Sequence, residues 1–154
     1  MLFYDNLKHF KKNVALIADD ISFSYGNLIE DAQKIAKEIN SKNLIFLLAD
    51  NDYESVTSIL ATEFSKSVSM LLNYNINNEI LLKLINLYNP DYIFLNKSNT
   101  LKIKNFENKL NFHNYILIKN KKSFKKKINS DLFLLQSTSG STGSPKNVRI
   151  SYEN

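Results

Sequence analysis

Hydrophobic and polar positions change their spacing several times along this chain, and each change marks an expected element. Two short apolar runs within residues 13–25 flank Asp19 and Asp20, so we expect a hairpin that turns at the two aspartates. Ser24 follows, and its hydroxyl can accept a hydrogen bond from an amide in the first turn of a helix. The next segment carries apolar residues on one helical face, at Leu28, Ala32, Ile35, Ala36 and Ile39.

The same helical spacing predicts two more helices farther along the chain. Either Asn51 or Asp52 caps the first of them, and either Asn77 or Asn78 begins the second. The Asn-Pro pair at 89–90 ends the second helix, because proline disfavours a helical conformation in the residue before it. The expected inward positions are Val56, Ile59, Leu60 and Phe64 in the first helix and Ile80, Leu81, Leu84, Ile85 and Tyr88 in the second.

Apolar runs between and after these helices predict strands. They cover residues 44–49, 67–72, 91–96, 115–119 and 131–136. Strands that are apolar on both faces and alternate with helices are typical of a parallel sheet covered on both sides. We therefore predict an α/β fold, a three-layer sandwich with a mostly parallel sheet. Ligands of such folds bind outside the carboxyl ends of the strands.

Composition narrows the class of protein. With 154 residues, 44% of them apolar and 23% charged, the chain suits one globular domain. No apolar run approaches the ~18 residues of a membrane span, and the N-terminus lacks the order of a secretory signal, so we expect a cytoplasmic protein. The absence of cysteine excludes disulfides and thiolate metal sites. His9 and His113 lack partners at ligand spacing, so we expect neither a histidine metal site nor a Ser-His-Asp triad.

The formal net charge is +5, and much of the excess lies in the segment Lys119–Lys127. Such a run can bind nucleic-acid phosphates, with a steep dependence on salt. Here the run contains no arginine, its single aromatic residue is Phe124, and it separates two apolar segments. We therefore interpret it as a solvated connecting loop and expect no nucleic-acid partner.

The stretch STSGSTGSPKNVRIS, residues 137–151, concentrates backbone freedom and hydroxyl groups in one place. It holds two of the three glycines of the protein and reaches Pro145 and Lys146 before a strand-like segment. Backbone amides of a glycine-rich turn can converge on an anion, while hydroxyls and a lysine add donors. A di- or triphosphate suits such a loop. The candidate phosphate-binding residues are Thr138, Ser139, Gly140, Ser141, Thr142, Gly143 and Lys146.

The spacing of these residues excludes three well-known loops. Pro145 stands where a Walker loop needs glycine, and the two glycines lack the spacing of the dinucleotide fingerprint. Ser141 lacks the glycine that a nucleophile elbow requires two residues before its serine. A flexible Ser/Gly linker is the alternative for the loop, and a solvated lysine is the alternative for Lys146. The linker is disfavoured because residues 147–151 alternate like a strand.

Residues 138–154, TSGSTGSPKNVRISYEN, closely resemble the phosphate-binding signature of the adenylate-forming (ANL) superfamily. That superfamily includes acyl-CoA synthetases, firefly luciferase and the adenylation domains of nonribosomal peptide synthetases. Asn147 replaces the usual glycine, a mild change because asparagine tolerates positive φ. Residues 21–39 and 50–73 resemble earlier helices and a strand of the superfamily more loosely. The matching loop positions are Thr138, Ser139, Gly140, Ser141, Thr142, Gly143, Pro145, Lys146 and Val148.

The resemblance implies an ATP-dependent ligase that activates a carboxylic or amino acid as an acyl-adenylate and releases pyrophosphate. The acyl group would then pass to a thiol, such as CoA or the phosphopantetheine of a carrier protein. Residues 138–146 would hold the β- and γ-phosphates of ATP. Mg²⁺ would accompany the nucleotide, with its ligand outside this sequence.

The resemblance also implies a division of the chain. Residues 1–130 would form the N-terminal α/β subdomain, and residues 131–154 would carry a strand, the phosphate-binding loop at 137–146, a second strand and the start of a helix. Because the superfamily places its adenine pocket, its magnesium carboxylate and a second lysine farther along, we expect the N-terminal part of a longer enzyme, inactive alone and without catalytic residues. The alternative is a free-standing, non-catalytic module that binds phosphate or docks another protein.

Overall fold

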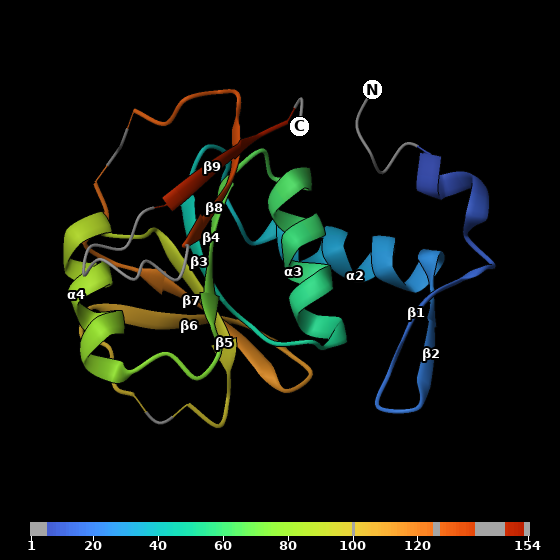
Figure 1. Ribbon diagram of the computed structural model, residues 1–154, viewed down its shortest axis with the longest axis horizontal. Coiled ribbons are helices and arrows are strands. Elements are labelled where there is room, and N and C mark those ends of the chain that lie inside the picture. The colour runs from blue at the N-terminus through green and yellow to red at the C-terminus, as the bar shows by residue number, and fades with distance from the viewer. Residues whose placement is uncertain (1–5, 100, 125–126, 138–146, 153–154) are drawn as a thin grey trace.

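A seven-stranded mixed sheet forms the centre of the protein (Figure 1). The structure is a computed structural model that describes residues 6–99, 101–124, 127–137 and 147–152. Four neighbouring strands in the middle of the sheet run parallel to one another. In spatial order they are β5 (Tyr92–Asn96), β3 (Leu44–Ala49), β4 (Val68–Asn73) and β8 (Leu132–Ser137).

Antiparallel strands complete the sheet at both edges. Beside β5 the order continues with β7 (Tyr115–Asn120) and then β6 (Phe106–Phe112), and beside β8 it ends with β9 (Asn147–Ser151). The expected mostly parallel sheet is confirmed in its centre, and the structure adds the antiparallel edges. The expected strands at 115–119 and 147–151 are β7 and β9.

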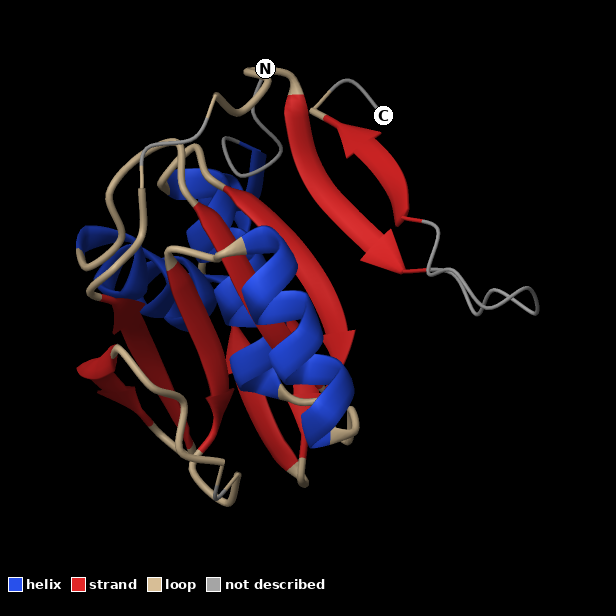
Figure 2. Ribbon diagram, turned by 90° about the vertical axis from the view of Figure 1, so that its left-hand side faces the viewer, coloured by secondary structure: helices blue, strands red, loops and turns tan. Residues whose placement is uncertain are grey.

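Helices cover both faces of the sheet, which confirms the three-layer α/β architecture. The helices α2 (Tyr25–Lys37) and α3 (Tyr53–Phe64) lie on one side, and α4 (Asn78–Tyr88) lies alone on the other (Figures 1 and 2). Outside α2, a short 3-10 helix, η1 (Lys8–Phe10), precedes a separate two-stranded sheet.

Burial on both faces explains why the central strands are apolar throughout. In β3 alternate residues enter different cores: Ile45 and Leu47 pack with α2 and α3, whereas Phe46 and Leu48 pack with α4. Because side chains of a strand alternate between its two faces, a strand between two helical layers needs apolar residues at every position.

The N-terminal hairpin turns where the sequence predicted. Its strands β1 (Val14–Ala18) and β2 (Ile21–Ser24) pair antiparallel, and both turn residues have positive φ, 50° at Asp19 and 62° at Asp20. Two-residue hairpin turns with positive φ at both positions match the twist of the strands, and aspartate tolerates that conformation better than most residues.

The expected cap of α2 is also confirmed. The Ser24 hydroxyl oxygen accepts a hydrogen bond from the Asn27 backbone N–H at 3.1 Å, and the Asn27 side-chain oxygen accepts one from the Ser24 backbone N–H at 3.0 Å. This reciprocal pair satisfies two amides that the helix cannot pair internally.

The expected inner face of α3 is partly wrong. Val56 is 42% exposed, and the buried face of the helix is rich in small hydroxyl residues instead. Thr57 and Thr62 each donate a hydroxyl hydrogen bond to the carbonyl oxygen four residues earlier, at 2.7 and 2.9 Å. Because their polar groups are satisfied within the helix, these residues can be buried against neighbouring elements without a polar partner there.

Two further expectations need correction. Ile80, expected on the inner side of α4, is 50% exposed, while Leu81, Leu84 and Ile85 are buried as expected. The strand β6 was not predicted at all. It is an edge strand with mostly polar side chains, and a bulge between Asn108 and Leu110 interrupts its alternation, so periodicity does not reveal it.

We expect Ser24→Ala to lower the free energy of unfolding by about 1 kcal/mol, the usual value of an N-cap hydroxyl. Urea denaturation monitored by far-UV circular dichroism would measure the loss. Ser22→Ala is the matched control, because Ser22 is exposed in the same strand and makes no cap. Equal stability of the two variants would contradict the role of the cap.

Candidate functional site

The predicted phosphate-binding residues, Thr138 to Lys146, lie outside the described residues. The structure does place the two ends of this loop. Ser137 ends β8, Asn147 begins β9, and the backbones of these two residues are opposite each other in an antiparallel pair. The loop therefore starts at the carboxyl end of a strand that belongs to the parallel centre of the sheet, which is where ligands of α/β folds bind.

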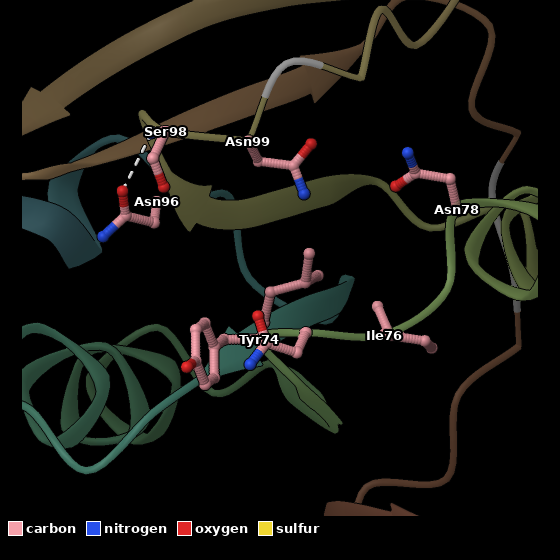
Figure 3. Close-up of a pocket in the computed structure, with 8 residues that line it drawn as sticks. Tyr74, Ile76, Asn78, Asn96, Ser98 and Asn99 are labelled. Carbon is pink, nitrogen blue, oxygen red and sulfur yellow. Dashed lines mark hydrogen bonds between the residues drawn. The ribbon is translucent and has the colours of Figure 1, made fainter.

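A small pocket lies at this carboxyl-end edge of the sheet, where the parallel strands end. Its volume is about 280 Å³, and its walls follow the carboxyl ends of β3, β4 and β5 (Figure 3). In the register of β4 and β8, Gln136 pairs with Leu71, three residues before Tyr74 in the pocket wall. The start of the predicted loop and the pocket are therefore close neighbours along this edge. The pocket is lined by Leu48, Tyr74, Asn75, Ile76, Asn78, Asn96, Ser98 and Asn99.

The described side chains that line the pocket are uncharged. Asn96 and Asn99 each use the side-chain oxygen within a local turn, accepting the backbone N–H of Ser98 and of Leu101 at 2.9 Å. Their amide N–H groups remain as donors, and in Figure 3 Asn99 and Asn78 extend toward one another over the pocket. Such a lining can orient a ligand by hydrogen bonds. Among the described residues that line it, none is a carboxylate, a lysine or a histidine.

A second polar group at this edge holds the start of α3. Asp52 caps the helix by accepting the Ser55 backbone N–H at 2.8 Å through one oxygen, and its other oxygen accepts the Tyr115 hydroxyl at 2.6 Å. The neighbouring Tyr53 hydroxyl donates to Asp31 at 2.9 Å. These bonds tie α3 to β7 and to α2, so the segment between β3 and α3 has a defined position.

Burial keeps these tyrosines protonated. The low-dielectric surroundings of Tyr53 and Tyr115 raise the pKa of each phenol well above its ordinary value, and the acceptor carboxylates Asp31 and Asp52 raise it further. A phenol that stays neutral and donates to a carboxylate acts as a structural hydrogen-bond donor. These pairs therefore position the edge of the sheet and are poor candidates for proton transfer.

His113 lies near the same ends of the strands, in the turn between β6 and β7. His113 sits at positive φ, 45°, and stacks on Phe112 with ring centroids 4.3 Å apart. Its Nδ1 lies 3.5 Å from Glu54 Oε1, and about half of its side chain is exposed.

Among the residues that the structure describes, no three His, Cys, Asp or Glu side chains gather closely enough to hold a metal ion. Within the same ranges, none of the helices is both long and apolar enough to cross a bilayer.

Family comparison gives this edge its context. Residues 3–154 match the family of AMP-binding enzymes. The chain belongs to this family. Its predicted phosphate-binding loop falls within the matched residues, between β8 and β9. Comparison with the sequences of curated proteins gives no match.

Solved structures of adenylate-forming enzymes share the fold. The N-terminal subdomain of Klebsiella oxytoca NpsA, in complex with 3-hydroxybenzoyl-AMSN, has a TM-score of 0.70 and 19% identity, over 97% of this chain and 40% of that one. O-succinylbenzoate coenzyme A synthetase (MenE) from Bacillus subtilis, in complex with AMP, has a TM-score of 0.70 and 16% identity, over 98% and 42%. The chain therefore spans about two fifths of these relatives and has the fold of their N-terminal part.

A third structure adds a carrier domain to the comparison. NpsA-ThdA, an artificially fused adenylation-PCP di-domain from Klebsiella oxytoca, has a TM-score of 0.53 and 19% identity. The match covers 58% of this chain and 18% of that one. At these identities all three comparisons concern the fold.

The raised pKa values predict how stability depends on alkaline pH. A phenol whose pKa is raised by folding stabilises the fold fully below its unfolded pKa of about 10, and that contribution is lost as the pH rises further, because the unfolded chain releases the proton first. We expect Tyr115→Phe to remove part of the fall in unfolding free energy above that pH. At pH 7 the same substitution should lower the free energy of unfolding by about 1–2 kcal/mol, because the hydrogen bond to Asp52 is lost.

Urea denaturation at a series of pH values would measure both effects of Tyr115→Phe. Tyr74→Phe is the control, because the Tyr74 side chain is 41% exposed and lines the pocket rather than the core. If the unfolding free energy of the Tyr115→Phe variant falls above about pH 10 as steeply as that of the unsubstituted protein, the role given to the Tyr115 phenol is contradicted.

Proposed function

We propose that this chain is the N-terminal part of an ATP-dependent ligase that activates a carboxylate by forming an acyl-adenylate. One observation carries the proposal: the residue pattern of the phosphate-binding signature lies between β8 and β9, at the carboxyl end of the parallel sheet of an AMP-binding enzyme. Both the residue types and their place in the fold suit a nucleoside triphosphate.

In this proposal the loop binds the leaving group of the reaction. Backbone amides of Gly140 and Gly143, the neighbouring hydroxyls and the Lys146 ammonium would surround the β- and γ-phosphates. The substrate carboxylate attacks the α-phosphate, the bond from that phosphorus to the bridging oxygen breaks, and pyrophosphate leaves. Positioned donors lower the barrier because they match charge that develops on the departing oxygens. The loop supplies neither a nucleophile nor a base.

The cofactor and partners follow from the same proposal. ATP would bind with Mg²⁺, which shields the phosphate charge, and we assign no residue of this chain to the metal. The substrate is a carboxylic or amino acid, and the acceptor of the acyl group is a thiol of CoA or of a carrier protein. The ligands named for the related structures, AMP and 3-hydroxybenzoyl-AMSN, support a nucleotide site, and the fused PCP supports a carrier partner. We place the protein in the cytoplasm.

Exchange of labelled pyrophosphate into ATP tests the function directly. An antibody against this segment would first show how long the native polypeptide is in its source cells. The exchange assay would then use the protein of that length. We expect exchange that depends on an added carboxylic or amino acid, and no exchange by residues 1–154 alone. A full-length protein that exchanges pyrophosphate with no acid of a broad panel would contradict the proposal.

We expect Lys146→Ala in the intact enzyme to weaken pyrophosphate exchange by about 1.5–3 kcal/mol, since a hydrogen bond to a charged group is worth that much. This loss corresponds to roughly ten- to 150-fold in rate. Lys42→Ala is the control, because Lys42 is an exposed lysine in the turn before β3 and the substitution removes the same charge. Full exchange activity in the Lys146→Ala variant would identify Lys146 as a solvated loop residue.

A further inference from the structure

A second hollow lies at the amino ends of the central strands, on the side of the sheet opposite the predicted nucleotide loop. Its volume is about 530 Å³. It lies between the C-terminal half of α4, the segment that leads from β5 into β6, and the segment that follows β7. We call it the α4–Phe124 groove, and it is lined by Leu82, Ile85, Asn86, Asn89, Lys102, Ile103, Lys104, Asn105, Phe106, Asn120, Lys122 and Phe124.

A buried hydrogen-bond network gives the groove a fixed shape. Asn120, only 4% exposed, donates its side-chain N–H groups to the Asn89 side-chain oxygen at 2.7 Å and to the Pro90 carbonyl at 3.0 Å. Its own oxygen accepts the Lys122 backbone N–H at 2.9 Å. The end of α4 and the segment after β7 are thereby joined, so the groove exists before any ligand binds.

The surface of the groove combines exposed apolar groups with an apolar floor. Phe124 is 65% exposed and Leu82 is 38% exposed, while Ile85, which also lines the groove, is buried. Exposed apolar groups that are continuous with a packed core mark interaction sites, and an aromatic side chain in such a place is a frequent anchor.

The charge at the rim has one sign. The side chains of Lys102, Lys104 and Lys122 are exposed, and none of the three forms an ion pair with any residue that the structure describes. The adjacent Lys121 differs, because it pairs with Glu107 at 3.0 Å. None of the described residues that line the groove is acidic, so its rim is positively charged.

We propose that the α4–Phe124 groove binds an acidic amphipathic helix of a partner protein. The apolar stripe of such a helix would cover Leu82, Ile103 and Phe124, and the carboxylates beside the stripe would face the three lysines. Helix-in-groove binding uses this combination of an apolar stripe and flanking charges. Complementary charge of this kind raises the rate of association and selects the partner.

The apolar floor favours a protein partner over nucleic acid. A nucleic-acid site needs phosphate contacts over an extended basic surface, and arginine is its most frequent base-reading residue. The described lining of the groove has three lysines around an apolar centre and no arginine. Because it lies at the amino ends of the central strands, a bound helix would leave the carboxyl edge, where the predicted nucleotide loop begins, accessible.

Binding of a designed peptide tests the proposal. The probe is a fluorescein-labelled helical peptide of about five turns, roughly 18 residues, with leucine along one stripe and glutamate beside it. A peptide with glutamine in place of glutamate and a labelled DNA duplex are measured in parallel, by fluorescence anisotropy at low salt. We expect the glutamate peptide to bind about tenfold more tightly than the glutamine peptide, and salt to reduce the difference.

Matched variants locate the binding surface. We expect the double substitution Lys102→Glu and Lys122→Glu to weaken peptide binding by about tenfold or more, because attraction becomes repulsion. Phe124→Ala should weaken it by about tenfold, as for an aromatic anchor. The controls are the pair Lys12→Glu and Lys42→Glu for the charge change, and Leu87→Ala, 73% exposed on α4 but outside the groove, for the apolar change.

Each result supports or overturns the proposal. Weaker peptide binding by the groove variants, with little change in peptide binding by the control variants, would support it. Equal losses in both sets, equal binding of the two peptides, or no binding of the glutamate peptide would overturn it. Tighter binding of the duplex than of the peptide, lost in the Lys102→Glu and Lys122→Glu variant, would overturn it in favour of nucleic acid. All of the substituted side chains are exposed, so the folded state should persist, and circular dichroism checks this.

Discussion

The central strand β3 is the constraint on which the rest of the structure depends. All of its residues from Leu44 to Leu48 are buried, and their side chains alternate between two separate cores. A strand of this kind needs a helical layer on each face and a hydrogen-bonded neighbour on each side. Parallel neighbours β4 and β5 meet the second need, and the helices that return the chain between parallel strands meet the first.

Parallel pairing around β3 also determines where function can lie. The carboxyl ends of four strands meet at one edge, where the amide-lined pocket, the start of α3 and the start of the predicted loop are found together. The amino ends meet at the other edge, where Asn120 joins the end of α4 to β7 beside the lysine-rimmed groove. A ligand at one edge therefore does not compete for space with a ligand at the other.

Much of the fold could be predicted from local chemistry. The hairpin turn at Asp19 and Asp20, the cap at Ser24 and the buried strands depend on residues close in sequence, and the structure agrees with each. The errors have a different cause. Val56 is exposed because α3 buries small hydroxyl residues that satisfy their own hydrogen bonds, and hydrophobic periodicity does not register such residues as buried. The strand β6 was not predicted because it is an edge strand with mostly polar side chains, and a bulge interrupts its alternation of apolar and polar residues.

The sequence by itself determined most of the helices and strands, the family resemblance and the residues proposed to bind phosphate, because capping, hydrophobic spacing and loop chemistry are properties of neighbouring residues. The tertiary structure decided which distant residues meet. The bond from Tyr115 to Asp52, the asparagine pocket and the α4–Phe124 groove each join segments that are far apart in the chain. Such contacts depend on strand order and register, which follow from the packing of the whole sheet and leave no local pattern in the sequence.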